Sequence, residues 1–323
     1  MISPRFWQNG GWLTLTLIPI SWLWRLVTDI RKAITKPYRS SLPLICVGNA
    51  IVGGAGKTPT VLAIANKLID DGKRVGLLSR GYGGRYAGTL HVDLTVHTFA
   101  DVGDESILLT EIAPTVVARR LADGARLLEN SDCDVIIMDD GLQNPSVVPT
   151  ISLLVVDAVI GIGNGQIIPS GPLREPWNDS LQKAHAVLLI GEDRKEIKSL
   201  IGDQHLILHG ALEPSPAALS LRNRRVLGFA GIGRPDKFHE TLIEIGAKVI
   251  GFRSFADHHP YRSSELIELV EQAVFEDAIL VTTSKDATRL PLWFRINVTV
   301  VEISLVWSDP TAFSVFLNRM LSF

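Results

Sequence analysis

The segment from Ile45 to Thr60, I-C-V-G-N-A-I-V-G-G-A-G-K-T-P-T, has the residue types of a phosphate-binding loop. Its glycines free the backbone to turn N–H groups toward a polyphosphate, Lys57 can reach the outer phosphates, and the Thr58 hydroxyl can coordinate Mg²⁺. The predicted nucleotide-binding residues are Gly53, Gly54, Ala55, Gly56, Lys57, Thr58 and Pro59. Such loops usually begin with a glycine where this chain has Ile51, so a glycine-rich turn without a ligand is the alternative.

Two pairs of carboxylates accompany the loop. Asp139 and Asp140 follow the apolar run V-I-I-M, so they stand at the end of a predicted strand. There they can hold Mg²⁺ directly or through water; a strand followed by an acidic turn is the alternative. Asp104 and Glu105 precede a helical stretch. They can supply a general base for a hydroxyl that attacks a phosphate, or simply cap the helix.

Two adjacent histidines stand beside a carboxylate only at Asp257, His258 and His259. An aspartate there can orient an imidazole and raise its basicity, although a solvated turn would have the same composition. Arg80, in S-R-G-Y-G-G-R, and Arg174, in I-P-S-G-P-L-R-E-P, can clamp a phosphate or pair with surface acids.

Alternating apolar strands and helices must position these side chains. Strands are predicted at 44–47, 75–79, 134–138 and 151–156, with helices at 58–70 and 118–129 between them. This order favours an α/β fold with a mainly parallel sheet covered on both faces. A second α/β unit begins near Arg222, after a proline-containing linker at 212–221. We therefore expect three parts: 1–35, 36–212 and a smaller C-terminal domain at 213–323.

The N-terminal part is apolar. Its unbroken run from Trp12 to Trp24 has about 13 residues, whereas a spanning helix needs roughly 20. Three tryptophans with a basic flank (Arg25, Arg31, Lys32, Lys36 and Arg39) indicate a helix at a membrane interface facing the cytoplasm. A helix buried in the core is the alternative.

Composition excludes some classes of protein. The 323 residues carry a net charge of −2, so nucleic acid is not an expected partner. Cys46 and Cys133 lie far apart in apolar runs, which argues against a disulfide framework and favours a reducing compartment. Hydrophobic residues make up 46% of the chain, in keeping with membrane contact or deeply buried sheets.

Eight motifs follow one another along the chain: V-G-N-A-I-V-G-G-A-G-K-T-P, L-S-R-G-Y-G, G-D-E, D-D-G-L-Q, P-S-G-P-L-R-E-P, G-I-G-R-P-D-K-F, D-H-H-P-Y and T-T-S-K-D-A. In this order they resemble the tetraacyldisaccharide 4′-kinase family over nearly the whole chain. The resemblance implies transfer of the ATP γ-phosphate to the 4′-hydroxyl of a tetraacylated glucosamine disaccharide 1-phosphate, giving lipid IVA in lipid A biosynthesis. It further implies a P-loop NTPase-like three-layer core, Mg²⁺, a monotopic or single-helix anchor on the cytoplasmic side of the inner membrane, and no obligate protein partner.

The resemblance also implies roles for single residues. Lys57 matches the P-loop lysine and Asp104 the proposed base, with His258, taken in preference to His259, as its partner and Asp257 beside it. The implied metal-site residues are Thr58, Asp139, Asp140 and Glu105, and the candidate substrate-binding residues are Arg80, Gln143 and Arg174. Ser106 and Ser284 depart from the family pattern, which has proline and glutamate there.

Two other classes of protein compete with a kinase. A membrane-tethered GTPase or ATPase switch shares the phosphate loop, but no guanine-reading N-K-x-D segment is present. A non-catalytic membrane scaffold has no need for the loop or for the two acidic pairs.

Overall fold

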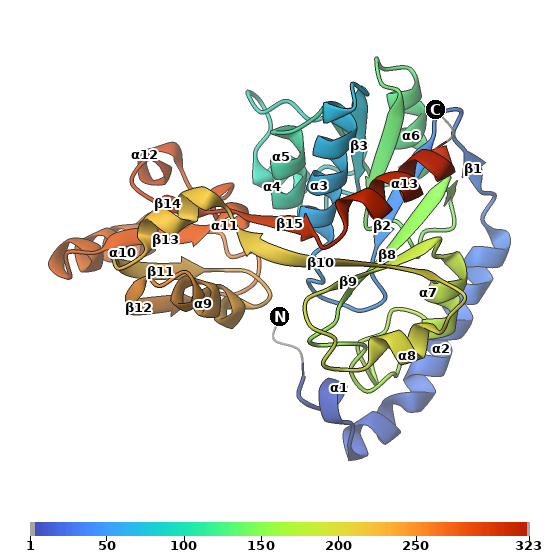
Figure 1. Cartoon of the computed structure of the whole chain (residues 1–323), viewed down its shortest axis with the longest axis horizontal. Coiled ribbons are helices and arrows are strands. Elements are labelled where there is room, and N and C mark those ends of the chain that lie inside the picture. Colours follow the sequence, from blue (N-terminus) through green and yellow to red (C-terminus); the bar gives the residue numbers. More distant parts are fainter. Residues whose placement is uncertain (1–3, 322–323) are drawn as a thin grey trace.

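A computed structural model describes residues 4–321, which form a large α/β unit, a smaller one and a long N-terminal helix (Figure 1). Within that range, the larger sheet has nine strands in the order β15-β10-β9-β8-β2-β6-β3-β5-β4. Their bounds are β15 (Ile303–Trp307), β10 (Leu206–Pro214), β9 (Ala186–Ile190), β8 (Ile151–Asp157), β2 (Leu44–Gly48), β6 (Val135–Asp139), β3 (Val75–Ser79), β5 (Thr115–Ala118) and β4 (Thr89–His91). Only the two edge strands, β4 and β15, pair antiparallel.

Helices cover both faces of this sheet, so the core has three layers, as predicted. The central strands are buried on both sides, because alternate side chains pack into two separate clusters. One cluster lies under α3 (Lys57–Asp70), α5 (Asp104–Thr110) and α13 (Pro310–Leu321). The other lies under α6 (Leu121–Glu129), α7 (Trp177–Lys183) and α8 (Ile197–Ile201). A short pair, β1 (Tyr38–Arg39) and β7 (Val147–Val148), and the helix α4 (Phe99–Val102) lie outside these layers.

The smaller unit has a parallel four-stranded sheet in the order β12-β11-β13-β14. The strands are β11 (Arg225–Ala230), β12 (Lys248–Ser254), β13 (Ile279–Thr283) and β14 (Thr299–Val301). Helix α9 (Pro235–Glu244) packs on one face, while α10 (Ser263–Phe275) and α12 (Leu292–Arg295) pack on the other. The one-turn helix α11 (Ser284–Ala287) follows β13 directly, at the end that faces the large unit (Figure 1).

The chain crosses between the two units twice. Strand β10 runs out of the large sheet into a 3₁₀ turn at Pro216–Leu221, in the segment expected to be a linker. After β14 the chain returns, and β15 pairs antiparallel with β10 while α13 contributes to the same apolar cluster as α3. The C-terminal domain was expected to extend to residue 323, but the segment from Ile303 to Leu321 belongs to the large unit. Its short apolar strand and helix carry no sequence signal of the sheet that they join.

The N-terminal region forms α1 (Phe6–Asn9) and α2 (Trp12–Ile34), which lies along the large unit (Figure 1). Helix α2 continues ten residues beyond the apolar run predicted from the sequence. It is the one helix among residues 4–321 that is long and apolar enough to span a membrane, by length and composition only. Only 11% of its apolar window is buried in the protein, so it is not the core helix considered as an alternative.

Candidate active site

The phosphate loop connects β2 to α3 at the carboxyl edge of the large sheet. Gly53 and Gly56 have φ angles of 117° and 87°, in the left-handed region that favours glycine. A Cβ on Gly56 would also lie only 2.6 Å from the Ile190 Cδ1 atom. All seven residues predicted to bind nucleotide, from Gly53 to Pro59, line one cleft of about 2300 Å³ between the two units.

Ile51 lies in an extended segment ahead of the turn. It forms a β-bridge with Leu173, while the Val52 N–H donates to the Pro172 carbonyl at 2.8 Å. The Arg174 N–H donates in turn to the Ala50 carbonyl at 2.9 Å. A buried side chain suits such a paired position, so the missing glycine is no defect here. The same pairing brings Arg174 to the loop.

The Lys57 ammonium is held at the floor of the cleft. It donates to Asn49 Oδ1 at 3.1 Å and lies 3.7 Å from Asp140 Oδ1. Arg174 Nη1 donates to the same Asp140 oxygen at 2.8 Å. Burial would raise the pKa of Asp140, but the charges of Lys57 and Arg174 lower it below its usual range. The cations that relieve the repulsion between the two adjacent aspartates are thus Lys57 and Arg174.

Asp139 has a different environment. Burial first, and then the charge of Glu105, raise the pKa of Asp139 to about 7. Its Oδ1 atom is buried without a hydrogen-bond partner among the described residues, a costly arrangement unless a ligand binds there. The other predicted metal-site carboxylates, Asp140 and Glu105, form ion pairs with Arg174 and Lys285.

These oxygen donors fit Mg²⁺. Mg²⁺ commonly binds one or two carboxylates together with water and substrate phosphates, and not an all-protein cage. In keeping with that, no group of three His, Cys, Asp or Glu side chains within residues 4–321 is arranged to hold a metal ion by itself. Asp139 and the Thr58 hydroxyl, in the first turn of α3, are the residues best suited to hold it.

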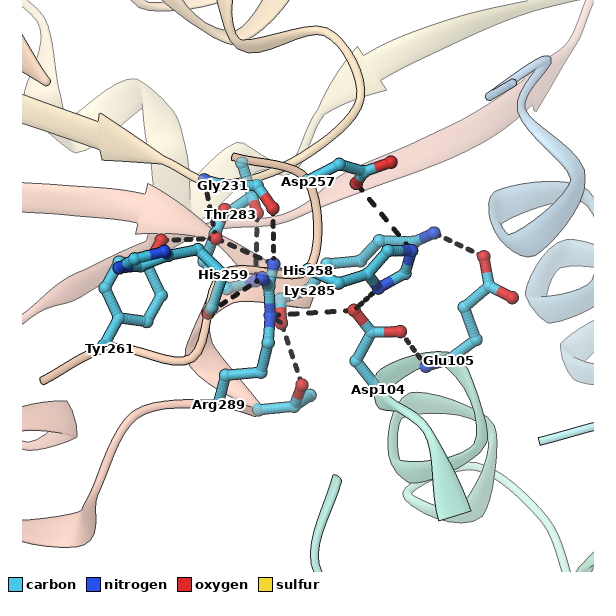
Figure 2. Close-up of polar contacts among 12 residues, drawn as sticks. Asp104, Glu105, Gly231, Asp257, His258, His259, Tyr261, Thr283, Lys285 and Arg289 are labelled. Carbon is cyan, nitrogen blue, oxygen red and sulfur yellow. Dashed lines mark hydrogen bonds and ion pairs between the residues drawn. The ribbon is translucent and has the colours of Figure 1, made fainter. Parts of the chain in front are cut away.

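Asp104 and His258 meet across the cleft between the two units (Figure 2). His258 Nδ1 donates to Asp104 Oδ2 at 2.9 Å. This bond raises the pKa of His258. Burial would raise the pKa of Asp104, but the bond to His258 and the charge of Lys285 lower it. Asp257 Oδ1 lies 3.8 Å from His258 Nε2, whereas His259 is bound to Glu265 at 2.9 Å.

The three predicted substrate-binding residues have different surroundings. Arg80 is exposed on the cleft wall after β3, and Arg174 is bound to Asp140. Gln143 also lines the cleft, but its Nε2 atom donates to the Asn49 carbonyl at 2.9 Å. Because Asn49 Oδ1 accepts from Lys57, Gln143 supports the loop from behind.

Known kinases are similar to this chain over its whole length. The family model described as tetraacyldisaccharide-1-P 4′-kinase matches residues 13–322. The chain belongs to this family. The tetraacyldisaccharide 4′-kinase of Rhodospirillum centenum is 44% identical over 328 residues and covers 100% of this chain and 97% of the relative. That of Methylorubrum extorquens is 48% identical, with 96% of each chain covered.

A solved structure of the tetraacyldisaccharide 4′-kinase family has the same fold. It is LpxK from Aquifex aeolicus, crystallised in complex with ATP. The two chains are 26% identical with a TM-score of 0.78, and the match covers 96% of this chain and 99% of that one.

This member of the tetraacyldisaccharide 4′-kinase family has further side chains at the site that sequence reasoning missed. Lys285, in T-T-S-K-D-A, donates from the small unit to Glu105 Oε1. Arg289 is buried and lies 3.6 Å from Asp104 Oδ2. Arg234 Nη1 donates to the buried Asp157 at 3.0 Å, which makes another contact between the units. The motif T-T-S-K-D-A was the available sequence signal for Lys285, whereas Arg289 lies outside the motifs.

Helix α2 is attached to the kinase core through polar residues. Ser21 Oγ lies 2.7 Å from Ser170 Oγ and also donates to the Ile167 carbonyl. Lys32 donates to the buried Glu175 at 2.9 Å. These partners stand in the loop that carries Arg174. The opposite face of α2 exposes large apolar side chains: Trp12, Leu15, Ile20, Trp22, Leu23, Leu26, Val27, Ile30 and Ile34.

Proposed function

We propose that this chain transfers the γ-phosphate of ATP to the 4′-hydroxyl of a tetraacylated glucosamine disaccharide 1-phosphate, giving lipid IVA. The observation that carries the proposal is the Asp104–His258 pair, because His258 lines the same cleft as the Lys57 loop. Membership of the tetraacyldisaccharide-1-P 4′-kinase family supports the substrate class. ATP as the phosphate donor is supported by the solved relative, which was crystallised with ATP.

In this mechanism the ionised Asp104 carboxylate accepts the proton of the attacking hydroxyl. The hydroxyl oxygen forms a bond to the γ-phosphorus while the bond to the β–γ bridging oxygen breaks, which leaves ADP. Hydrogen bonding from His258 orients the Asp104 carboxylate, and Lys57 stabilises charge on the phosphate oxygens. Mg²⁺, held by Asp139 and Thr58, would neutralise further phosphate charge.

The lipid substrate suggests where the enzyme works. Helix α2 combines an exposed apolar face with a polar face bound to the core, which is typical of a helix lying in a membrane interface. A helix crossing the bilayer would have to give up these polar contacts or bury them in lipid. We therefore favour a monotopic anchor on the cytoplasmic side of the inner membrane, the side that supplies ATP.

Mass spectrometry of the product tests the proposed function. The purified protein is incubated with ATP, Mg²⁺ and the acylated disaccharide 1-phosphate in detergent micelles. The lipid is expected to gain one phosphate, and Asp104→Asn is expected to slow that gain by about 10²-fold or more. ATP hydrolysis that leaves the lipid unmodified would contradict the proposal.

A further inference from the structure

Lys285 reaches from the small unit into the site of the large one. It stands in the first turn of α11, and its ammonium donates to Glu105 Oε1 at the start of α5 (Figure 2). The side chain lines the same cleft as Lys57 and keeps about a third of its surface exposed. It is therefore an accessible cation at the site, with no part in the mechanism described so far.

The turn that carries Lys285 is rigidly held by its neighbour in sequence. Asp286 is completely buried and accepts hydrogen bonds from the Gly231 N–H at 2.8 Å, the Tyr261 hydroxyl at 2.6 Å and Arg289 Nη2 at 2.8 Å. The Thr283 hydroxyl caps the turn by accepting from the Asp286 N–H. Little freedom remains for this backbone, so the position of Lys285 follows the position of the small unit.

The same network fixes the loop that carries His258. Arg289 Nη2 donates to the Gly231 carbonyl at 3.0 Å, and Arg289 Nη1 to the His259 carbonyl at 3.3 Å. The His258 N–H donates in turn to the Gly231 carbonyl at 3.0 Å. His258 and Lys285 therefore belong to one rigid assembly, and their side chains extend side by side toward Asp104 and Glu105 (Figure 2). Docking of the small unit places both at once.

Lys57 and Lys285 line the same cleft from different units. The charges of Lys57 and Lys285 both act on Glu105, and both also act on Asp139. The two ammonium groups thus reach this acidic group from different units, one from the floor of the cleft and one from the docking unit. A phosphate held by Lys57 would add negative charge to this cleft, and added negative charge favours a second cation.

We infer that Lys285 is a further catalytic residue, which exchanges Glu105 for the oxygens of the transferred phosphoryl group when the units close on substrate. The inference rests on the proposed kinase function. Lys285 donates hydrogen bonds and transfers no proton: the hydroxyl proton still goes to Asp104 and the leaving oxygen stays on ADP. Because charge on these oxygens develops most in the transition state, Lys285 acts on kcat more than on ATP affinity.

The test compares two variants of the small unit. Lys285→Met keeps the approximate length of the side chain and removes its charge. The control is Lys248→Met, which replaces an exposed lysine on β12. Turnover is measured with ATP, Mg²⁺ and the acylated disaccharide 1-phosphate, ATP affinity by calorimetry, and folding by the thermal midpoint. Lys285→Met is expected to lower kcat by roughly 10²-fold or more while the Kd for ATP changes by less than about threefold. Lys248→Met is expected to match the wild type. Added ethylammonium is expected to restore part of the turnover of Lys285→Ala.

Two results would overturn the inference. One is a Lys285→Met variant that turns over within about threefold of the wild type. The other is a loss of kcat in Lys285→Met together with an equal loss of ATP affinity, with no recovery of turnover when an amine is added to Lys285→Ala. That result would mean that Lys285 only holds the two units together. Absence of lipid phosphorylation in the wild type would instead contradict the proposed kinase function, so the two failures are distinguishable.

Discussion

Replacing Leu15 and Trp22 by alanine removes two large side chains from the apolar face of α2, each 69% exposed. Burying such a side chain completely is worth roughly 1.5–3 kcal/mol, so the two exposed portions together contribute about 2–4 kcal/mol to membrane binding. A loss of that size corresponds to roughly 30- to 1,000-fold weaker partitioning into a bilayer. Stability should change little, because both side chains already face away from the core.

Co-sedimentation with vesicles containing anionic lipid measures this partitioning directly. The matched control is Phe275→Ala on α10, because Phe275 is 88% exposed but belongs to the small unit. The double variant is expected to remain in the supernatant at lipid concentrations that sediment the wild type, and the control to sediment with the wild type. The thermal midpoint of each variant shows whether it is folded.

Equal sedimentation of the double variant and the wild type would refute the assignment of α2 as the membrane-binding element. A loss of binding in Phe275→Ala as large as in the double variant would refute it as well, since exposed apolar surface in general would then explain the binding. High salt separates the apolar contribution from that of the basic flank, which ions screen.

Three further predictions concern the site and the attachment of α2. Asp104→Asn is expected to lower kcat by about 10²- to 10⁴-fold with an unchanged thermal midpoint; near-normal turnover would exclude Asp104 as the base. The bond to Asp104 raises the pKa of His258. The contribution of this bond to the free energy of unfolding is therefore complete below about pH 6.5 and is lost as the pH rises through the raised pKa. Urea unfolding from pH 6 to 9 should therefore show a decline that His258→Gln lacks, and parallel curves would contradict it. Glu175→Gln leaves Lys183 and Lys32 beside a buried neutral amide and is expected to cost about 1.5–3 kcal/mol in urea unfolding, because both lysines keep about a third of their surface in water. The exposed control Glu192→Gln should cost under about 1 kcal/mol. An effect at Glu175 no larger than that of the control would contradict a stabilising role of these ion pairs.

The sequence predicts well where local pattern and global fold agree. The strands around Cys46, Ile137 and Leu154 are continuous apolar runs bounded by turn residues, as buried parallel strands require. The phosphate loop is likewise recognisable, because its chemistry needs particular residues at consecutive positions.

Contacts between distant segments could not be predicted in this way. The bridge from Ile51 to Leu173 joins residues more than a hundred positions apart. Asp140 likewise links Arg174 to Lys57, two residues that are also more than a hundred positions apart. Nothing in local periodicity encodes which strand β15 will pair with. Lys285 and Arg289 illustrate the same limit, because their importance depends on how two separately folded units meet.

The direction in which α2 presents its faces also had no local signal. Hydropathy describes an apolar helix, but not that Thr14 and Ser21 face the protein while the large apolar residues face outward. The orientation of α2 depends on the hydrogen-bonding groups of the 164–175 loop, and these groups come together only in the folded core.

The two strands that join the units, β10 and β15, pair with each other up to the point where the chain leaves the large unit. Pro214 on β10 lies directly opposite Ile303 on β15, and the Ser215 N–H donates to the Glu302 carbonyl at 2.9 Å. The whole small unit is thus an insertion at the tip of a β-hairpin, and a two-residue turn could close that hairpin in its place. Excision of residues 215–302 should leave a shortened protein whose large sheet, α13 included, still folds. Such a protein would retain the phosphate loop and lose both His258 and Lys285. It should therefore still bind nucleotide but no longer transfer phosphate.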